Sequence, residues 1–286
     1  MSKLFPYLFR NSAAILFVAL WTLVILSILS VGIASRVSSE INLAKYLDNR
    51  LISFYLAKAA VNQTIIELKN KAEKKNYDTL YELRRKREAI LGEGSFELYL
   101  TDEEGLINIS APSSSLIEHL PGLDPTLVEA ITQSHQKPFL LKEELLLIEG
   151  ITPEIFSEFK NLITTYSSCQ VNINTASGDV LRALGLEDGL VEIILRYRKG
   201  EDQLEATEDD GEFKDAASIL NDLRKFTILT VEQELQIAEL LSKNLLCVNS
   251  SNLKLNILTK VHGRPSMRYA IILDRSSGKI KFWQEN

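Results

Sequence analysis

NSAAILFVALWTLVILSILS (residues 11–30) decides how the rest of the chain is organised. Residues 13–34 carry no charged side chain, and a helix of that length, at 1.5 Å per residue, crosses a hydrocarbon layer of about 30 Å. Lys3 and Arg10 precede this run and no acidic residue does. The positive-inside rule therefore predicts that the N-terminal stub is cytoplasmic and that the chain after Arg36 lies across the membrane.

The helical pattern continues past the apolar run. No Pro or Gly interrupts residues 33–74, and apolar side chains recur there at steps of three and four residues, as on one face of a helix. They are Leu47, Leu51, Phe54, Ala57, Val61, Ile65 and Leu68. We expect one helix of about fifty residues or more, half in lipid and half packed on a domain. A secretory signal cut after Ala34 is the alternative, but it leaves this continuation unexplained.

The composition is that of a folded protein whose main partner is not nucleic acid. The chain has 286 residues, 45% hydrophobic and 24% charged, with a formal net charge of −6. Binding to phosphate backbones requires clustered Lys and Arg. The charged stretch at residues 69–87 is interpreted as a solvated helix face rather than a binding patch.

The two cysteines, Cys169 and Cys247, follow the apolar helix and so lie in an oxidising compartment. An even pair in that setting favours a disulfide over two free thiols or a metal site.

Strand patterns bracket a helical block. Residues 95–101 alternate with period two, 102–105 form a turn and 106–109 return, which predicts a hairpin. Three later strands are expected, at 253–261, 267–273 and 279–283. The sequence therefore predicts an α+β protein, with a long N-terminal helix packed on a small antiparallel sheet and an all-helical domain inserted between its strands.

The helical block contains similar units at residues 120–127, 148–155 and 184–193. In the first two, Gly ends one helix, Asp124 or Thr152 caps the next, and proline takes the first helical position. These are helix-hairpin-helix-like units.

Units of that kind often bind the DNA backbone, and VNINTAS (residues 171–177) is similar to the opening of competence DNA-receptor domains. The hairpins here carry Asp124, Glu149, Glu187 and Asp188, which repel phosphate. A membrane-anchored DNA-binding envelope protein is therefore kept as the alternative function.

A loop at residues 201–212 holds seven carboxylates, and Glu208, Asp209, Asp210 and Glu212 are candidate ligands for calcium, a cation that prefers oxygen. The spacing is not that of an EF-hand, so an acidic loop without metal is the simpler interpretation. The three histidines have no partner at a catalytic spacing, and no nucleotide-binding or nucleophile motif is present. We expect a protein that is not an enzyme.

Several segments in order resemble the K-type minor pseudopilins of type II secretion systems (general secretion pathway protein K, GspK). They are residues 14–27, 102–109, 144–156, 171–176, 269–273 and 282–283. The resemblance covers nearly the whole chain and implies a pilin-like sheet with an inserted helical domain. The implied layout is a prepilin leader at 1–13, a transmembrane segment at 14–35, the rest of the helix and the first strands at 36–112, the inserted domain at 113–245 and the final strands at 246–286.

The resemblance also implies how the N-terminus is processed. A prepilin peptidase would cut between Ala13 and Ala14, although most relatives have Gly before the cut, and cleavage after Ser12 stays open. Most pilin-like subunits have Glu as the fifth mature residue, where this chain has Val18. A subunit at the filament tip has no neighbouring amine for that carboxylate to neutralise, so the apolar residue fits the tip.

The expected partners follow from the family. They are the I- and J-type minor pseudopilins, the pseudopilus, the prepilin peptidase and the bacterial inner membrane, with the C-terminal domain in the periplasm and no nucleic acid. The expected disulfide between Cys169 and Cys247 would tie the inserted domain to the last strands. A minor pilin of a type IV pilus is the other alternative.

Overall fold

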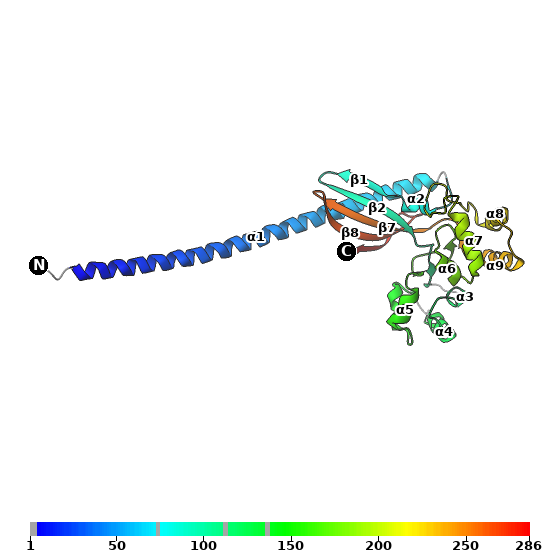
Figure 1. Ribbon diagram of the computed structural model, residues 1–286, viewed down its shortest axis with the longest axis horizontal. Helices are drawn as coiled ribbons and strands as arrows, with labels where there is room; N and C mark the ends of the chain where they lie inside the picture. Colours follow the sequence, from blue (N-terminus) through cyan, green and yellow to red (C-terminus); the bar gives the residue numbers. More distant parts are fainter. Residues whose placement is uncertain (1–4, 73–74, 111–113, 135–137) are drawn as a thin grey trace. The chain divides into compact units, whose positions relative to one another are not determined.

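The computed structural model describes residues 5–72, 75–110, 114–134 and 138–286, without the side chains of 5–13, 72, 114 and 115 (Figure 1). The chain divides into two compact units, Met1–Phe54 and Tyr55–Asn286. Helix α1, Phe5–Ala72, belongs to both. The prediction of one uninterrupted helix is therefore confirmed.

The first unit consists of α1 up to Phe54. The apolar side chains between Ile15 and Leu51 are exposed, and a window of mean hydropathy 2.7 has none of its residues buried. Ser27 and Ser30 donate their hydroxyl hydrogens to the carbonyls of Leu23 and Leu26, at 2.8 Å each. Their polar groups are thus satisfied within the helix, as a hydrocarbon environment requires. This helix is long and apolar enough to cross a membrane.

A five-stranded antiparallel sheet organises the second unit. Its order is β1-β2-β7-β8-β9. The strands are β1 (Arg87–Leu91), β2 (Gly94–Asp102), β7 (Asn252–Val261), β8 (Arg264–Asp274) and β9 (Ile280–Glu285). Alternate side chains on β2 are buried, as expected for a sheet covered on one face.

The last turns of α1 supply a buried stripe for this sheet. Ala57, Ala60, Val61, Thr64 and Leu68 are all buried, at helical spacing. The β8–β9 turn touches this helix, since a side chain at Gly278 would lie 3.6 Å from Ile65. The α+β class with a long helix packed on a small antiparallel sheet is confirmed.

The predicted hairpin over residues 95–109 is wrong. β2 pairs with β1 before it and with β7 far along the chain, whereas Ile107 and Asn108 form β3, which pairs in parallel with β4 (Ile163–Thr164). Residues 106–109 therefore leave the sheet and enter the helical region. The alternation of 95–101 showed a strand but not its partner.

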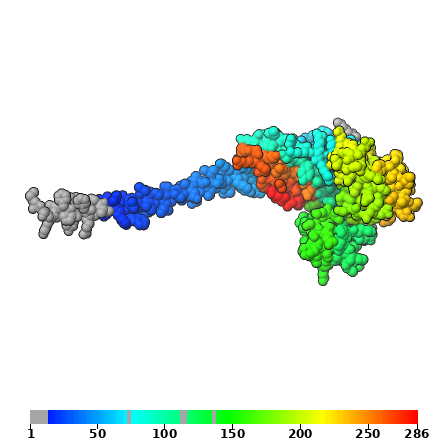
Figure 2. Space-filling model, viewed as in Figure 1, coloured from blue at the N-terminus to red at the C-terminus, as the bar shows by residue number. Residues whose placement is uncertain are grey.

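The helical region lies between β2 and β7 in the chain, next to one end of the sheet (Figure 1). The green-to-yellow segments gather there in Figure 2. Its elements are α3 (Ser114–Ile117), α4 (Pro125–Gln133), η1 (Lys142–Leu147), α5 (Pro153–Phe159), β4, β5 (Val171–Asn172), α6 (Gly178–Ala183), α7 (Asp188–Arg198), η2 (Ala216–Ser218), α8 (Ile219–Phe226), α9 (Val231–Ser242) and β6 (Leu246–Cys247). A short helix α2 (Leu80–Arg84) precedes β1.

This region has its own apolar core, which includes Ile107, Phe159, Leu181, Ile194 and Phe213, each fully buried or nearly so. β5 and β6 pair in parallel within it, so that the segment before the last strands closes onto the inserted helices. The helices therefore pack around a hydrophobic core of their own, separate from the side chains that they place against the sheet.

The local helix signals are confirmed. Asp124 caps α4 by accepting hydrogen bonds from the amides of Thr126 and Leu127, and Thr152 caps α5 through the amide of Ile155. Gly150, before the second cap, has φ +92°. That conformation suits glycine, which lacks the side chain that would clash there.

Candidate functional site

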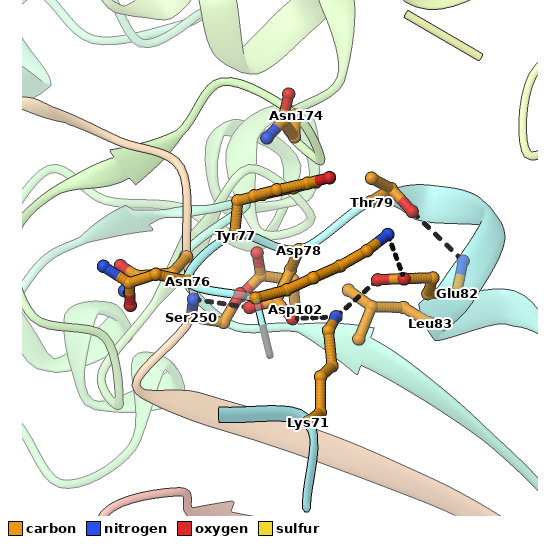
Figure 3. Close-up of polar contacts among 12 residues, drawn as sticks. Lys71, Asn76, Tyr77, Asp78, Thr79, Glu82, Leu83, Asp102, Asn174 and Ser250 are labelled. Carbon is orange, nitrogen blue, oxygen red and sulfur yellow. Dashed lines mark hydrogen bonds and ion pairs between the residues drawn. The ribbon is translucent and has the colours of Figure 1, made fainter. Parts of the chain in front are cut away.

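The end of α1 meets the sheet at a buried carboxylate, Asp78, in the connection to α2 (Figure 3). Lys71 Nζ of α1 lies 2.8 Å from Asp78 Oδ1. Arg275 of the β8–β9 turn donates two hydrogen bonds to the same carboxylate, at 2.6 and 3.0 Å. The amide of Ser250, just ahead of β7, donates a fourth at 2.8 Å. Asp78 thus joins three separate parts of the second unit.

The charge of Asp78 is stabilised by its partners. Burial acts to raise the pKa of this carboxyl, but the hydrogen bond and charge of Arg275, followed by those of Lys71, outweigh burial and lower the pKa below its ordinary value. The side chains of Lys71 and Arg275 are themselves only 18% and 16% exposed. A buried carboxylate between two nearly buried cations fixes geometry because losing one partner leaves an unpaired charge.

A second set of ion pairs continues from this point. Lys71 also bonds Glu82 of α2, and Lys75 lies 3.0 Å from the same carboxylate. Arg87, at the start of β1, donates to Glu67 of α1 at 2.8 and 2.9 Å. The interpretation of residues 69–87 as a solvated helix face is therefore wrong, because the run ends one helix, forms another and begins a strand while its charges pair across them.

The sheet joins the helical region through the acidic residues that end β2. Asp102 Oδ2 accepts hydrogen bonds from Asn172 Nδ2 at 2.8 Å and from Thr175 Oγ1 at 2.6 Å. Glu104 accepts two from Asn252, through the amide and the side chain, at 3.0 Å each. This second cluster holds the helical region against the first residues of β7.

The VNIN segment is explained by these contacts. The Asn172 side chain binds Asp102, while the Asn174 side chain donates to the carbonyl of Phe213 at 2.8 Å and accepts from its amide at 3.0 Å. Asn174 therefore closes the end of the acidic loop. The pattern quoted from the sequence as a DNA-receptor-like opening has a structural role in this chain.

The sequence did not identify these residues as a site. Residues 102–105 were assigned to a turn, and the 69–87 stretch to a solvent-facing helix. The one available signal was three consecutive acids directly after an alternating strand, because a strand end lies against whatever covers the sheet edge. The side-chain partners of these three acids are separated from them by about 60 to 150 residues and carry no pattern that marks them.

The processing residues lie in α1. Ala14 and Val18 are exposed, Val18 at 59%, among other apolar side chains. The side chain of Ala13 lies outside the described residues, as do residues 1–4. Val18 thus belongs to the apolar surface that a membrane or a neighbouring helix would cover.

In the structure no disulfide joins Cys169 and Cys247, so the expected bridge is not formed. The β5–β6 register pairs Asn172, rather than Cys169, with Cys247. Cys169 precedes β5 and has a left-handed backbone, φ 71°. Burial raises the pKa of both thiols, and Cys247 donates to the carbonyl of Asn249 at 3.3 Å. Oxidation to a disulfide would require this segment to rearrange.

The calcium candidates line one open hollow together with Asp222. Three of these carboxylates, those of Asp209, Asp210 and Glu212, already have protein partners. Asp209 accepts from the amides of Glu201 and Asp202 at 2.9 and 3.1 Å, and Asp210 accepts from the amide of Ala206 at 2.9 Å. Across the described residues, no three His, Cys, Asp or Glu side chains converge as metal ligands would. Calcium binding by Glu208, Asp209, Asp210 and Glu212 stays a prediction of the sequence.

Comparisons with known proteins support the fold. No protein-family model and no curated protein matches the chain. Among solved structures, the chain is similar to one chain of the GspK-GspI-GspJ complex from the enterotoxigenic Escherichia coli type 2 secretion system. The TM-score is 0.59 at 15% sequence identity, and the match covers 86% of this chain and 98% of that one. The overall fold is therefore that of a pseudopilin-like protein.

Proposed function

We propose that this chain is a K-type minor pseudopilin, GspK, of a type II secretion system. One observation carries the proposal: a long helix leads into a small antiparallel sheet that is interrupted by a large helical insertion, and the similarity to one chain of the GspK-GspI-GspJ complex covers 86% of this chain and 98% of that one. The order of the sequence segments that resemble this family supports it independently.

The proposed location follows from the anchor helix. The first 13 residues form a prepilin leader in the cytoplasm, residues 14–35 cross the inner membrane once and Tyr55–Asn286 lies in the periplasm. The prepilin peptidase removes the leader between Ala13 and Ala14, and the apolar helix stays in place. The exposure of every apolar side chain in the spanning window supports this role.

We place the subunit at the tip of the pseudopilus, where it starts assembly and caps the filament for export across the outer membrane. Val18 provides no carboxylate for the terminal amine of a subunit above it. The helical insertion next to the sheet adds bulk that would obstruct stacking of a further subunit. The partners are I- and J-type minor pseudopilins, and the exposed apolar face of α1 is their contact surface. The role is structural and involves no catalysis.

The first test is the N-terminal mass of the protein purified from membranes of cells with and without prepilin peptidase. The proposal predicts loss of residues 1–13 only when the peptidase is present. An intact N-terminus in both strains, or a cut near Ala34, would remove the pseudopilin assignment.

A second test distinguishes the remaining alternatives. The full chain is coexpressed with the I- and J-type minor pseudopilins of its own genome, and with the minor pilins of any type IV pilus there. Stable copurification with the first set supports the type II assignment. The alternative of DNA binding predicts a gel shift that weakens steeply with salt, so no shift at low salt argues against it.

A further inference from the structure

The seam between the sheet and the helical region contains three consecutive acids without a cationic partner. Glu103 and Glu104 are buried and Asp102 is partly buried. In the ranges that the structure describes, none of the three forms an ion pair, whereas Asp78 nearby has two. Buried carboxylates normally pair with a cation or give up their charge by binding a proton.

Neutral donors from both sides of the seam hold these carboxyl groups. Asn172 and Thr175 of the helical region bind Asp102, and the Thr164 hydroxyl bonds Glu103. Asn252 of β7 binds Glu104 twice, and the amide of Asn172 donates to the Glu104 carbonyl at 2.8 Å. The three acids therefore connect the sheet to the inserted domain through hydrogen bonds.

The charged and titratable groups that face this triplet do not neutralise it. Asp78 faces Asp102 and adds negative charge, with Lys71 and Arg275 already bound to it. The Cys247 thiol approaches from β6. Lys281 of β9 is engaged by Asn252 and Asp274, Lys142 donates to the carbonyl of Lys160, and Tyr166 packs on Phe282 while facing Glu103. Lys142 and Lys281 thus donate their hydrogen bonds to other groups, and the charge of Glu103 acts on Lys142 without an ion pair between them.

Asp102 and Glu104 are not expected to be ionised at the same time at acidic pH. Burial, and then the charge of Asp102, raise the pKa of Glu104 to about 7. Burial and the negative charge of Asp78 raise the pKa of Asp102, against the effect of its hydrogen bonds. Because the folded value for Glu104 lies above its ordinary value, its contribution to stability is complete at acidic pH. That contribution is lost as the pH rises through about 7.

We propose that the Asp102–Glu104 pair is a proton-dependent clasp between the sheet and the inserted helical domain. With Glu104 protonated, the seam is closed by neutral hydrogen bonds. When Glu104 ionises, its buried carboxylate and the partly buried carboxylate of Asp102 repel each other, and the hydrogen bonds to residues 171–176 loosen. The clasp is independent of whether the chain joins a pseudopilus, since it concerns only contacts within Tyr55–Asn286.

Hydrogen exchange of the full chain in detergent micelles between pH 5.5 and 8, corrected for the intrinsic pH dependence of exchange, tests the clasp. We expect protection of residues 171–176 to fall about tenfold or more over this range in the wild type. Glu104→Gln, which cannot ionise, should vary by less than about threefold. Glu149→Gln removes an exposed carboxylate outside the seam, and should follow the wild type.

Asp102→Asn is a second variant for the same measurement, and it is needed if Glu104→Gln does not fold. Without the neighbouring charge, Glu104 should ionise at lower pH, so the loss of protection should move by at least half a pH unit toward acid. Protection that is flat with pH in the wild type, or equally steep in Glu104→Gln, would overturn the clasp. So would an Asp102→Asn curve that coincides with the wild-type curve.

Discussion

Asp78 shows most directly how single residues hold the second unit together. It is fully buried between Lys71 and Arg275, so removing its charge leaves Arg275 without its carboxylate partner and Lys71 with Glu82 alone. We expect Asp78→Asn to lower the free energy of unfolding by about 3 kcal/mol. Chemical denaturation of the full chain in detergent, followed by circular dichroism, measures the change.

The matched control for this change is Asp179→Asn. Asp179 also pairs with an arginine, Arg182 at 3.0 Å, but both side chains are exposed. Exposed pairs contribute little because water screens them. If the two variants lost similar stability, the ion pairs around Asp78 would not be the reason for its effect. The lowered pKa of Asp78 also means that its contribution is present above its ordinary pKa and disappears as the pH falls through the lowered value.

Val18 provides the residue-scale test of the tip position. A glutamate at this position would bring a carboxylate into the membrane, which costs roughly 3 kcal/mol when no partner neutralises it. We therefore expect Val18→Glu to be cleaved normally but to reduce the yield of the complex with the I- and J-type subunits, measured by copurification. Val18→Ala, which stays apolar, should retain the wild-type yield. Full assembly of Val18→Glu would show that a neighbouring amine does meet this position.

The two thiols predict a simple labelling pattern. Cys247 is buried, so iodoacetamide should modify it slowly in the folded protein and Cys169 faster. After denaturation without a reductant, both should be modified, because no disulfide joins them in the structure. Intact-protein mass spectrometry counts the adducts. If neither cysteine of the denatured protein is modified until a reductant is added, the disulfide expected from the sequence is present.

At the scale of elements, the glycine before the cap of α5 restricts which side chain the chain can carry at that position. Gly150 has φ +92°, and a Cβ there would lie 2.8 Å from Leu127 Cδ2. We expect Gly150→Ala to cost about 2 kcal/mol in thermal or chemical unfolding, through both backbone strain and this contact. Gly92 also has a positive φ, but nothing lies within 4 Å of its Cβ position. Gly92→Ala should therefore cost less, and equal costs would argue against the contact.

The sequence predicted elements well where the signal is local. The apolar period of α1, the caps Asp124 and Thr152 and the alternation in β2 all depend on residues close in the chain. Partners of distant residues could not be predicted. Nothing local shows that β2 pairs with β7, that Ile107 pairs with Ile163 or that Arg275 binds Asp78. The candidate site consists almost entirely of such distant contacts, which is why sequence reasoning missed it.

At the scale of the whole molecule, the structure predicts that the second unit folds without the anchor. The sheet, the stripe from Ala57 to Leu68 and the core of the helical region all lie within Tyr55–Asn286. A fragment of these residues should be monomeric without detergent and should unfold cooperatively in a thermal melt. Its hydrogen-exchange pattern from Asp78 onward should match that of the full chain. A fragment that aggregates or melts without a transition would show that the anchor half of α1 is needed for folding.

The position of the insertion also imposes an order in time. β2 and β7 are neighbours in the sheet, yet Asp102 pairs with Leu253, so about 150 residues separate the two strands in the chain. During synthesis the anchor and the β1–β2 hairpin emerge early, and β2 then has an unpaired edge until β7 emerges. The helical region can fold during this delay. The sheet is therefore completed last, and a truncated or stalled chain would carry an open strand edge that a chaperone or protease could recognise.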